Sequence, residues 1–325
     1  MKVYYVLSGS NEHLAQGELR ALLDVYDPNS KLECYTMVCT STTGIDVASR
    51  IIKRAGFVKE AGILLDIKEA YLPSEARFAG EIFEDREVQV TVNKSTVSEK
   101  AVKAFLEEAR LRKRIYGDCN RRLIFSEGLV FIGVKKLVYN SKIKSMFSRI
   151  KPFNRSAAIP PDIAQALVNL SRVHERDIVV DPFAGTGSIL LVAWLMGIRG
   201  IGVDIDWNLV NGMKTNLEFI KANSLAICGD SQQLSYREIE HIATDLPYGR
   251  SAGTHGSEIR ALYKSFMNKL DEYMGEGGYA CFMAPHWLED YIDELVSSHS
   301  LKLKNRYYDY VHGSLTRVIN VVSRH

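Results

Sequence analysis

The chain has 325 residues, of which 46% are hydrophobic and 25% charged, and its net charge at pH 7 is +2. This composition is typical of folded globular domains and excludes a disordered, collagen-like or disulfide-dense chain. No apolar run reaches roughly 18 residues and no secretory leader is present, which predicts a soluble cytoplasmic protein without a membrane segment. The five cysteines form no Cys-x-x-Cys pair, which predicts reduced thiols and no metal site.

The charge of the chain changes sign along its length. Up to Arg155 there are 26 Lys and Arg against 19 Asp and Glu, and beyond it there are 15 against 20. Between Arg110 and Arg155 the imbalance rises to 13 basic residues against two acidic ones, with aromatic residues interleaved. This pattern predicts a surface for a polyanion, RNA or DNA, and a solvated basic face without a ligand is the alternative.

The N-terminal part is predicted to be an α+β region of short mixed elements. Asn11 and Ser98 each precede apolar residues at helical spacing, so their side chains are expected to cap two helices. Short apolar runs predict the strands of this region. The expected helices cover 11–26 and 98–109, and the expected strands cover 3–7, 32–38, 63–66, 88–92 and 129–134.

The segment 151–162 is predicted to be a linker between two parts of the chain. It holds three prolines within 151–161, and proline neither continues a helix nor donates in a sheet. From 163 to the end, helix and strand patterns alternate. This alternation predicts an α/β fold with a doubly wound, mostly parallel sheet covered by helices on both faces.

A strand, a glycine turn and a helix follow one another in the C-terminal part. Residues 178–181 form the predicted strand, which ends in Asp181, and the next turn contains Gly185 and Gly187 before an apolar helix at 189–196. Glycine lets the backbone turn tightly and approach a ligand, so the unit predicts a nucleotide-binding site. The turn has no basic side chain and follows an acid, which favours S-adenosylmethionine over a dinucleotide with its pyrophosphate.

Two further predicted strands lead to acids. Asp204 ends the strand 200–204, and its carboxylate can accept from both hydroxyls of a ribose. Asp230 follows the strand 224–228 and is placed to accept from an adenine amine. Because parallel strands bring their carboxyl ends to one edge, these acids and Asp181 are predicted to line one ligand crevice. Solvated loop acids are the alternative.

Asp245 follows a fourth apolar strand and begins the sequence Asp-Leu-Pro-Tyr-Gly. A carboxylate can accept from an exocyclic amine, Pro247 stiffens the turn, and Tyr248 offers a ring on which an extruded base can stack. With the carbonyl of Leu246, Asp245 would engage both N–H bonds and direct the nitrogen lone pair toward a methyl sulfonium. The motif predicts methylation of an amino group, with an ordinary loop as the alternative.

The sequences Asp-Pro-Phe-Ala-Gly-Thr-Gly at 181–187 and Asp-Leu-Pro-Tyr-Gly at 245–249 resemble those of the THUMP-containing tRNA guanosine N2-methyltransferases. The second is also similar to the Asp/Asn-Pro-Pro-Tyr motif of amino-methyltransferases. The resemblance is specific from Lys151 onward and rests on pattern and charge before it. Further similar segments, the last of them typical of archaeal members that modify guanosine 10 of tRNA, lie at 151–153, 159–161, 166–170 and 311–317.

The resemblance implies a Rossmann-like class I S-adenosylmethionine-dependent methyltransferase domain at 163–325. It also implies a ferredoxin-like domain at 1–50 and a THUMP domain at 51–150. The implied reaction is methyl transfer to the N2 of a guanosine in tRNA, guanosine 10 first of all, to give N2-methyl- or N2,N2-dimethylguanosine. Leu246 stands where most relatives have a proline, which leaves the base preference less defined.

By the same resemblance, Asp245, Pro247 and Tyr248 form the catalytic motif, and S-adenosylmethionine is the cofactor. The residues expected to bind it are Asp181, Pro182, Phe183, Ala184, Gly185, Thr186, Gly187, Asp204, Ile205, Asp230 and Ser231. The THUMP domain is implied to hold the acceptor end of the tRNA. The basic residues expected to contact the RNA are Arg112, Lys113, Arg114, Arg121, Arg122, Lys135 and Lys136.

Three other functions stay open on the sequence. The motif can serve another base or RNA, such as adenine N6 or the N2 of ribosomal guanine, because it recognises an exocyclic amine. A catalytically inert RNA-binding module and a nicotinamide-dependent dehydrogenase are the other two. Some relatives work with a small zinc-containing activator subunit, and the sequence leaves open whether this chain does.

Overall fold

The computed structural model of the chain describes residues 2–84, 86–93, 96–115, 117–139, 142–147, 149, 151–154, 159–235, 237–248, 255–312 and 315–324. It divides into two compact units, unit 1 with residues 1–53 and 57–140 and unit 2 with residues 54–56 and 141–325. The linker positions 155–158 and the motif residues Gly249, Gly313 and Ser314 lie outside the described residues. The division of the N-terminal part at residue 50 stays a prediction.

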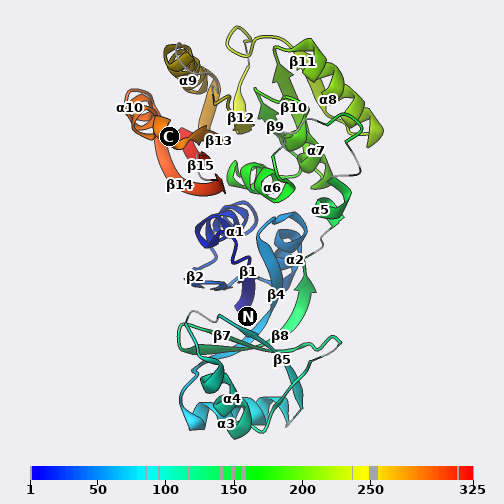
Figure 1. Cartoon of the computed structure of the whole chain (residues 1–325), viewed down its shortest axis with the longest axis vertical. Helices are drawn as coiled ribbons and strands as arrows, with labels where there is room; N and C mark the ends of the chain where they lie inside the picture. Colours follow the sequence, from blue (N-terminus) through cyan, green and yellow to red (C-terminus); the bar gives the residue numbers. More distant parts are fainter. Residues whose placement is uncertain are drawn as a thin grey trace. The chain divides into compact units, whose positions relative to one another are not determined.

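Unit 1 is built on a mixed sheet with the strand order β2-β3-β1-β4-β8-β7-β5-β6 (Figure 1). Strand β4 (Val58–Glu69) joins the two halves of this sheet, because one edge pairs with β1 (Lys2–Leu7) and the other with β8 (Leu129–Val138). The other elements are α1 (Glu12–Tyr26), β2 (Leu32–Tyr35), β3 (Val38–Ser41), α2 (Ile45–Arg54), α3 (Pro73–Phe83), β5 (Glu87–Val92), α4 (Glu99–Glu108), β6 (Arg112–Lys113) and β7 (Arg121–Ser126).

Both predicted helix caps of unit 1 are confirmed. The Asn11 side chain accepts from the backbone N–H of Leu14 at 3.2 Å, and Ser98 accepts from that of Ala101 at 3.2 Å. Each cap satisfies a backbone donor that has no partner within the first helical turn. Helix α4 then packs on the sheet through Phe105, whose ring meets that of Phe125 edge-on at 5.3 Å between centroids.

The strand predicted at 32–38 is wrong, because the chain reverses at Thr36. Strands β2 and β3 form a hairpin in which Cys34 lies directly opposite Cys39. These two cysteines form a disulfide, so the prediction of reduced thiols is wrong for this pair. The sequence pattern missed it because a spacing of five residues brings two cysteines together only when a tight turn lies between them. Cys119, Cys228 and Cys281 are free thiols.

Unit 2 contains a sheet with the strand order β11-β10-β9-β12-β13-β15-β14. Its first five strands are parallel, which confirms the predicted doubly wound sheet, and the pair β14–β15 adds an antiparallel edge beside β13. The strands are β9 (Ile178–Asp181), β10 (Arg199–Asp204), β11 (Leu225–Cys228), β12 (Ile239–Asp245), β13 (Met274–Pro285), β14 (Leu301–His312) and β15 (Leu315–Arg324).

The helices of unit 2 cover both faces of this sheet (Figure 1). Helices α6, α7 and α8 contact one another in succession, and α9 contacts α10. No helix within the described residues is long and apolar enough to cross a membrane. The helices are α5 (Lys142–Phe147), α6 (Pro161–Leu170), α7 (Ser188–Leu195), α8 (Trp207–Phe219), α9 (His255–Tyr273) and α10 (Glu289–Ser297), with a 3-10 turn at His286–Leu288.

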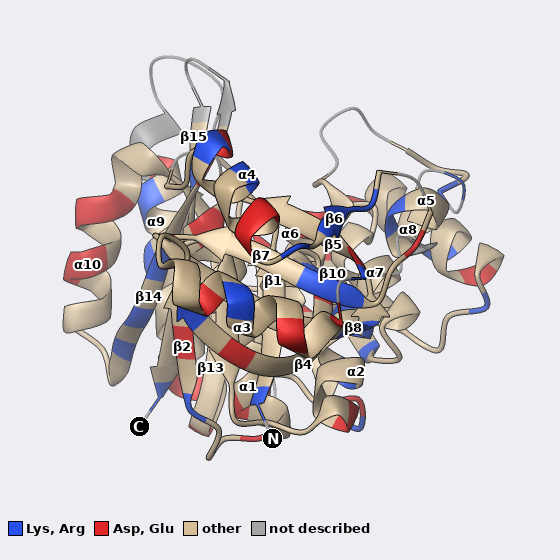
Figure 2. Cartoon of the chain, turned by 90° about the horizontal axis from the view of Figure 1, so that it is seen from below, with Lys and Arg blue, Asp and Glu red and all other residues tan. Residues whose placement is uncertain are grey.

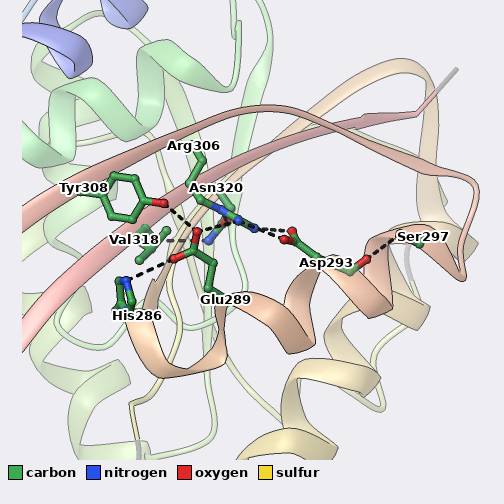
Figure 3. A network of polar contacts seen from close by, with 8 residues as sticks. All are labelled: His286, Glu289, Asp293, Ser297, Arg306, Tyr308, Val318 and Asn320. Carbon is green, nitrogen blue, oxygen red and sulfur yellow. Dashed lines mark hydrogen bonds and ion pairs between the residues drawn. The ribbon is translucent and has the colours of Figure 1, made fainter.

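A polar network fastens the edge strand β14 to helix α10 (Figure 3). The two ends of the Arg306 guanidinium donate to Glu289 at 2.9 Å and to Asp293 at 2.5 Å, and the Tyr308 hydroxyl donates to Glu289 at 2.6 Å. Arg306 Nε also donates to the Asn320 side chain on β15 at 2.9 Å. A forked guanidinium held from several sides has little freedom, so the network fixes the β14–β15 hairpin on the sheet.

Candidate active site

A cleft of about 560 Å³ lies at the carboxyl ends of the parallel strands of unit 2. This volume falls within the range of small-molecule sites, roughly 300–1,000 Å³. The described residues that line it come from the ends of β9, β10 and β12, from the segment after β11, and from α8, α9 and β15. The predicted site residues among them are Pro182, Phe183, Asp204, Ile205, Asp230, Ser231, Asp245, Pro247 and Tyr248.

The glycine turn has the backbone conformation for which glycine is needed. Gly185 and Gly187 have φ values of +53° and +80°. A Cβ on Gly187 would lie 2.8 Å from Cγ of Met213, whereas nothing lies within 4 Å of a Cβ built on Gly185. Open space over a glycine in the left-handed region leaves the backbone accessible to a ligand. The turn therefore fits a bound nucleotide.

The two acids at β10 and β11 are held in place by backbone donors. Asp204 accepts from the N–H of Gly185 at 2.8 Å and from that of Asp206 at 2.9 Å. Asp230 accepts from the N–H of Gln232 at 3.0 Å. A carboxylate has about four acceptor positions, so each acid keeps capacity for a ligand hydroxyl or amine.

Asp181 lies behind the glycine turn and is only 2% exposed. It accepts from the Thr244 hydroxyl at 2.6 Å and from the N–H of Phe183 at 3.2 Å. Burial raises the pKa of Asp181 to about 7, the two hydrogen bonds lower it, and the carboxylates of Asp245 and Asp204 raise it further. A cationic ligand group nearby would favour its charged form.

The catalytic motif forms the wall of the cleft at the end of β12. Asp245 is the last residue of that strand, and the Tyr248 hydroxyl donates to its carboxylate. Burial raises the pKa of Asp245 to about 6, while the hydrogen bond from Tyr248 and the charge of Arg317 lower it. At neutral pH the carboxylate is therefore mostly ionised and able to accept from an amine.

Asn216 on α8 holds the glycine turn against the segment around Phe153, and no sequence pattern predicted this residue. Its fully buried side chain donates to the carbonyl oxygens of Phe153 and Thr186 at 2.9 and 3.0 Å. It also accepts from the N–H of Phe153 at 2.9 Å. Phe153 itself lies against Gly212, where a Cβ would come within 2.2 Å of the ring. A buried asparagine in a helix has no sequence signal that separates it from a surface one.

Arg317 on β15 lines the cleft beside the catalytic motif, and it too was missed as a site residue. It is 9% exposed, and its nearest carboxylate is that of Asp309 on β14 at 3.8 Å. The available signal was its place in the segment 311–317 that resembles the archaeal enzymes. That segment indicated a turn rather than a side chain in the cleft.

Three of the predicted RNA contacts are exposed in unit 1. Arg112 and Lys113 form the short strand β6, and Lys136 lies on β8. Figure 2 shows these strands among the basic segments of the chain. Exposed cations on one sheet can contact a phosphate backbone without a structural change.

The other predicted RNA contacts are engaged inside unit 1. Arg122 is buried and its Nε donates to Glu60 at 2.7 Å, and the buried Lys135 donates to Asp118. Each neutralises a carboxylate of its own unit, so we leave Arg122 and Lys135 out of the RNA surface. Arg114 and Arg121 are half-buried and donate to the side chain and the carbonyl of Glu87 at 2.9 and 2.8 Å.

The parallel sheet, the glycine turn and the acidic cleft together define a methyltransferase with a Rossmann-like fold. Residues 148–319 match the model of the RMKL-like methyltransferase domain family, and the chain belongs to that family. A second model, described as DNA methylase, matches residues 70–215, a range that ends before Asp245. The crystal structure of TrmN from Thermus thermophilus has a TM-score of 0.56 at 14% identity and covers all of both chains, which supports the fold.

Two curated relatives confirm the resemblance inferred from the motifs. The tRNA (guanine(10)-N2)-dimethyltransferase of Methanothermobacter thermautotrophicus is 39% identical over 60% of this chain and 58% of that protein. The protein of the same name from Methanocaldococcus jannaschii is 28% identical over 98% of this chain and 99% of that protein. The similarity therefore extends through unit 1, although neither relative tests the THUMP assignment.

Proposed function

We propose that this chain transfers a methyl group from S-adenosylmethionine to the N2 of a guanosine in tRNA, namely guanosine 10. The observation that carries the proposal is that Asp204, Asp230 and the motif beginning at Asp245 line the same cleft. The names of the two relatives supply the base and the position. The product is N2-methyl- or N2,N2-dimethylguanosine, and we propose that the reaction takes place in the cytoplasm.

The residues of the cleft fit S-adenosylmethionine. Asp204 would accept from the ribose hydroxyls and Asp230 from the adenine amine, while the turn with Gly185 and Gly187 would lie against the methionine part, near Asp181. When bound, the cofactor supplies an electrophilic methyl group on a sulfonium. The uncharged turn and the surrounding carboxylates favour a cationic ligand over a pyrophosphate, which counts against the dehydrogenase.

Asp245 and the backbone carbonyl of Leu246 would position the guanine amine. They accept its two N–H bonds, and this turns the nitrogen lone pair toward the methyl carbon. The Tyr248 hydroxyl, which donates to Asp245 in this structure, gives way to the base. Transfer of the methyl group to N2, at the expense of its bond to sulfur, would leave N2 with an extra proton, which Asp245 would accept and pass to water.

Unit 1 would hold the tRNA. Its exposed cations Arg112, Lys113 and Lys136 are the proposed phosphate contacts, and the THUMP assignment of residues 51–150 belongs to this proposal. The small zinc-containing activator subunit of some relatives is a separate question. Turnover by the chain on its own would show that it needs no such subunit.

The experiment is methyl transfer from labelled S-adenosylmethionine to unmodified tRNA, ribosomal RNA fragments and DNA, followed by nucleoside analysis. We expect label in N2-methylated guanosine from tRNA alone. Label in N6-methyladenosine would establish the alternative base instead. Cofactor binding without transfer to any of these nucleic acids would favour the inert RNA-binding module, and binding of a nicotinamide dinucleotide instead of S-adenosylmethionine would favour the dehydrogenase.

A further inference from the structure

Arg317 is the one cation among the described residues that line the cleft, and the other charged ones are Asp204, Asp206, Asp230 and Asp245. Its Nε is buried without a hydrogen-bond partner in the described part of the chain. A buried guanidinium donor without a partner is costly, and such a cost is often met by a ligand that completes its hydrogen bonds.

The strand order places Arg317 away from the glycine turn and near Asp245. Strand β15 lies two strands from β12 and three from β9, which corresponds to about 10 and 14 Å at the usual strand spacing. Asp245 pairs in register with Met283 on β13, and Arg317 pairs with Pro285 on the same strand. The two side chains therefore belong to the same end of the sheet, and the charge of Arg317 acts on the carboxylate of Asp245.

The spacing of Asp245 and Arg317 allows the two side chains to contact opposite ends of one edge of a guanine base. Guanine has its amine N2 at one end of the Watson–Crick edge and the acceptor O6 at the other, whereas adenine has a donor amine in place of O6. A guanidinium is the side chain that most often recognises guanine O6 and N7. A phosphate at the same place would face the cleft's carboxylates, which would repel it.

We propose that Arg317 selects guanine over other purines by donating to its O6 while Asp245 accepts from N2. This rests on the proposed function and adds the base-recognition residue that the Asp-Leu-Pro-Tyr sequence lacks. Arg317 is held for this role by its place on the hairpin that Arg306 fastens to α10 (Figure 3) and by Asp309 at 3.8 Å. Adenine would bring an amine donor against the guanidinium and be rejected.

The test uses full-length protein and tRNA transcripts with guanosine or 6-thioguanosine at the target position. The thio base keeps N2 and the N1 proton but replaces O6 with sulfur, a weaker acceptor. We expect the wild type to have a kcat/KM about tenfold lower on the thio substrate. Arg317→Gln should lower kcat/KM on guanosine about ten- to hundredfold and bring the ratio of the two substrates close to one. Arg317→Lys keeps the charge but loses the forked guanidinium, so its ratio of kcat/KM on the two substrates should lie between those of the wild type and Arg317→Gln.

The affinity for S-adenosylmethionine, measured by calorimetry, serves as a readout that does not depend on RNA. It should be unchanged in both Arg317 variants, which also shows that unit 2 is folded. Lys302→Gln is the matched control, because it removes an exposed cation from β14 of the same hairpin outside the cleft and should keep the wild-type preference for guanosine over the thio base.

Each other outcome overturns the inference in a recognisable way. An Arg317→Gln variant that loses activity equally on both substrates assigns Arg317 to a phosphate or to the hairpin. A parallel loss of cofactor affinity assigns it to S-adenosylmethionine. A wild type that methylates no guanosine contradicts the proposed function itself, and this result is seen on the natural substrate before any variant is made.

Discussion

The cleft of unit 2 and the basic sheet of unit 1 both concentrate charge of one sign, but they place it differently. In the cleft, Asp204, Asp230 and Asp245 come from the ends of successive strands and line one cavity. In unit 1, Arg112 and Lys113 face solvent whereas Arg122 and Lys135 are buried with carboxylate partners. The order of parallel strands brings residues at their carboxyl ends to one edge of the sheet. A run of charges in the sequence, by contrast, does not determine which of its side chains are exposed.

The largest expected effect is a loss of methyl transfer when the catalytic motif of unit 2 is changed. Asp245→Ala should lower methyl transfer about a thousandfold, because it removes a preorganised contact to the reacting amine. Affinity for S-adenosylmethionine should stay within a factor of about two, since the proposed role of Asp245 is with the base. Single-turnover methylation and calorimetry measure the two quantities. Asp290→Ala removes an exposed carboxylate on α10 and serves as the control; a large loss of cofactor affinity in Asp245→Ala would reject its assignment.

The next effect concerns the glycine turn. Gly187→Ala adds a Cβ 2.8 Å from Cγ of Met213 at a φ of +80°, so the turn must shift and cofactor affinity should fall about ten- to hundredfold. Gly197→Ala is the matched control, because its φ is +82° but nothing lies within 4 Å of the added Cβ. It should cost only about 1 kcal/mol of unfolding free energy and leave affinity unchanged. Equal losses of affinity in both variants would contradict a specific role for the turn.

A smaller effect is expected on tRNA binding when the exposed cations of unit 1 are replaced. Replacing Arg112, Lys113 and Lys136 with alanine should weaken tRNA binding about tenfold and reduce the salt dependence of log K by about two to three. The control replaces the equally exposed Arg77, Lys100 and Lys103, which removes the same charge from α3 and α4. Binding measured against salt concentration separates the two triples. If both triple variants reduce the slope of log K against log salt concentration equally, the positive charge of unit 1 acts over a distance and not through direct contacts of Arg112, Lys113 and Lys136.

The smallest effect is a shift in pH dependence. With cofactor saturating, kcat/KM for tRNA, which reports the enzyme before the base binds, should be full above pH 7 and fall as pH drops through about 6, where Asp245 takes up a proton. Tyr248→Phe removes a hydrogen bond that lowers the pKa of Asp245, so its midpoint should move upward. The comparison of the two profiles is the measurement. A midpoint that stays the same or moves downward in Tyr248→Phe would contradict the contact between the two side chains.

The sequence predicted several local elements of both units well, because each depends on neighbouring residues. The strand ending at Asp181, the turn with Gly185 and Gly187, and the capped helix starts at Asn11 and Ser98 depend on neighbours a few residues away. Apolar runs and capping side chains carry that information directly.

The rest could not be predicted because it depends on register and on distant elements. Arg317 reaches the cleft through a strand that pairs with β13, and Asn216 holds the glycine turn through carbonyls at Phe153 and Thr186. The Cys34–Cys39 disulfide depends on where the hairpin turns. Likewise, no pattern separates the exposed Lys136 from the buried Lys135 until the sheet of unit 1 is formed.

The most direct test of the account is methyl transfer by this chain to a tRNA transcript with guanosine at position 10, beside the same transcript with adenosine there. The account predicts N2-methylated guanosine in the first and no incorporation in the second, and about a thousandfold less methylation of the first by Asp245→Ala. Equal incorporation into the two transcripts, or label on a nitrogen other than N2, would contradict it.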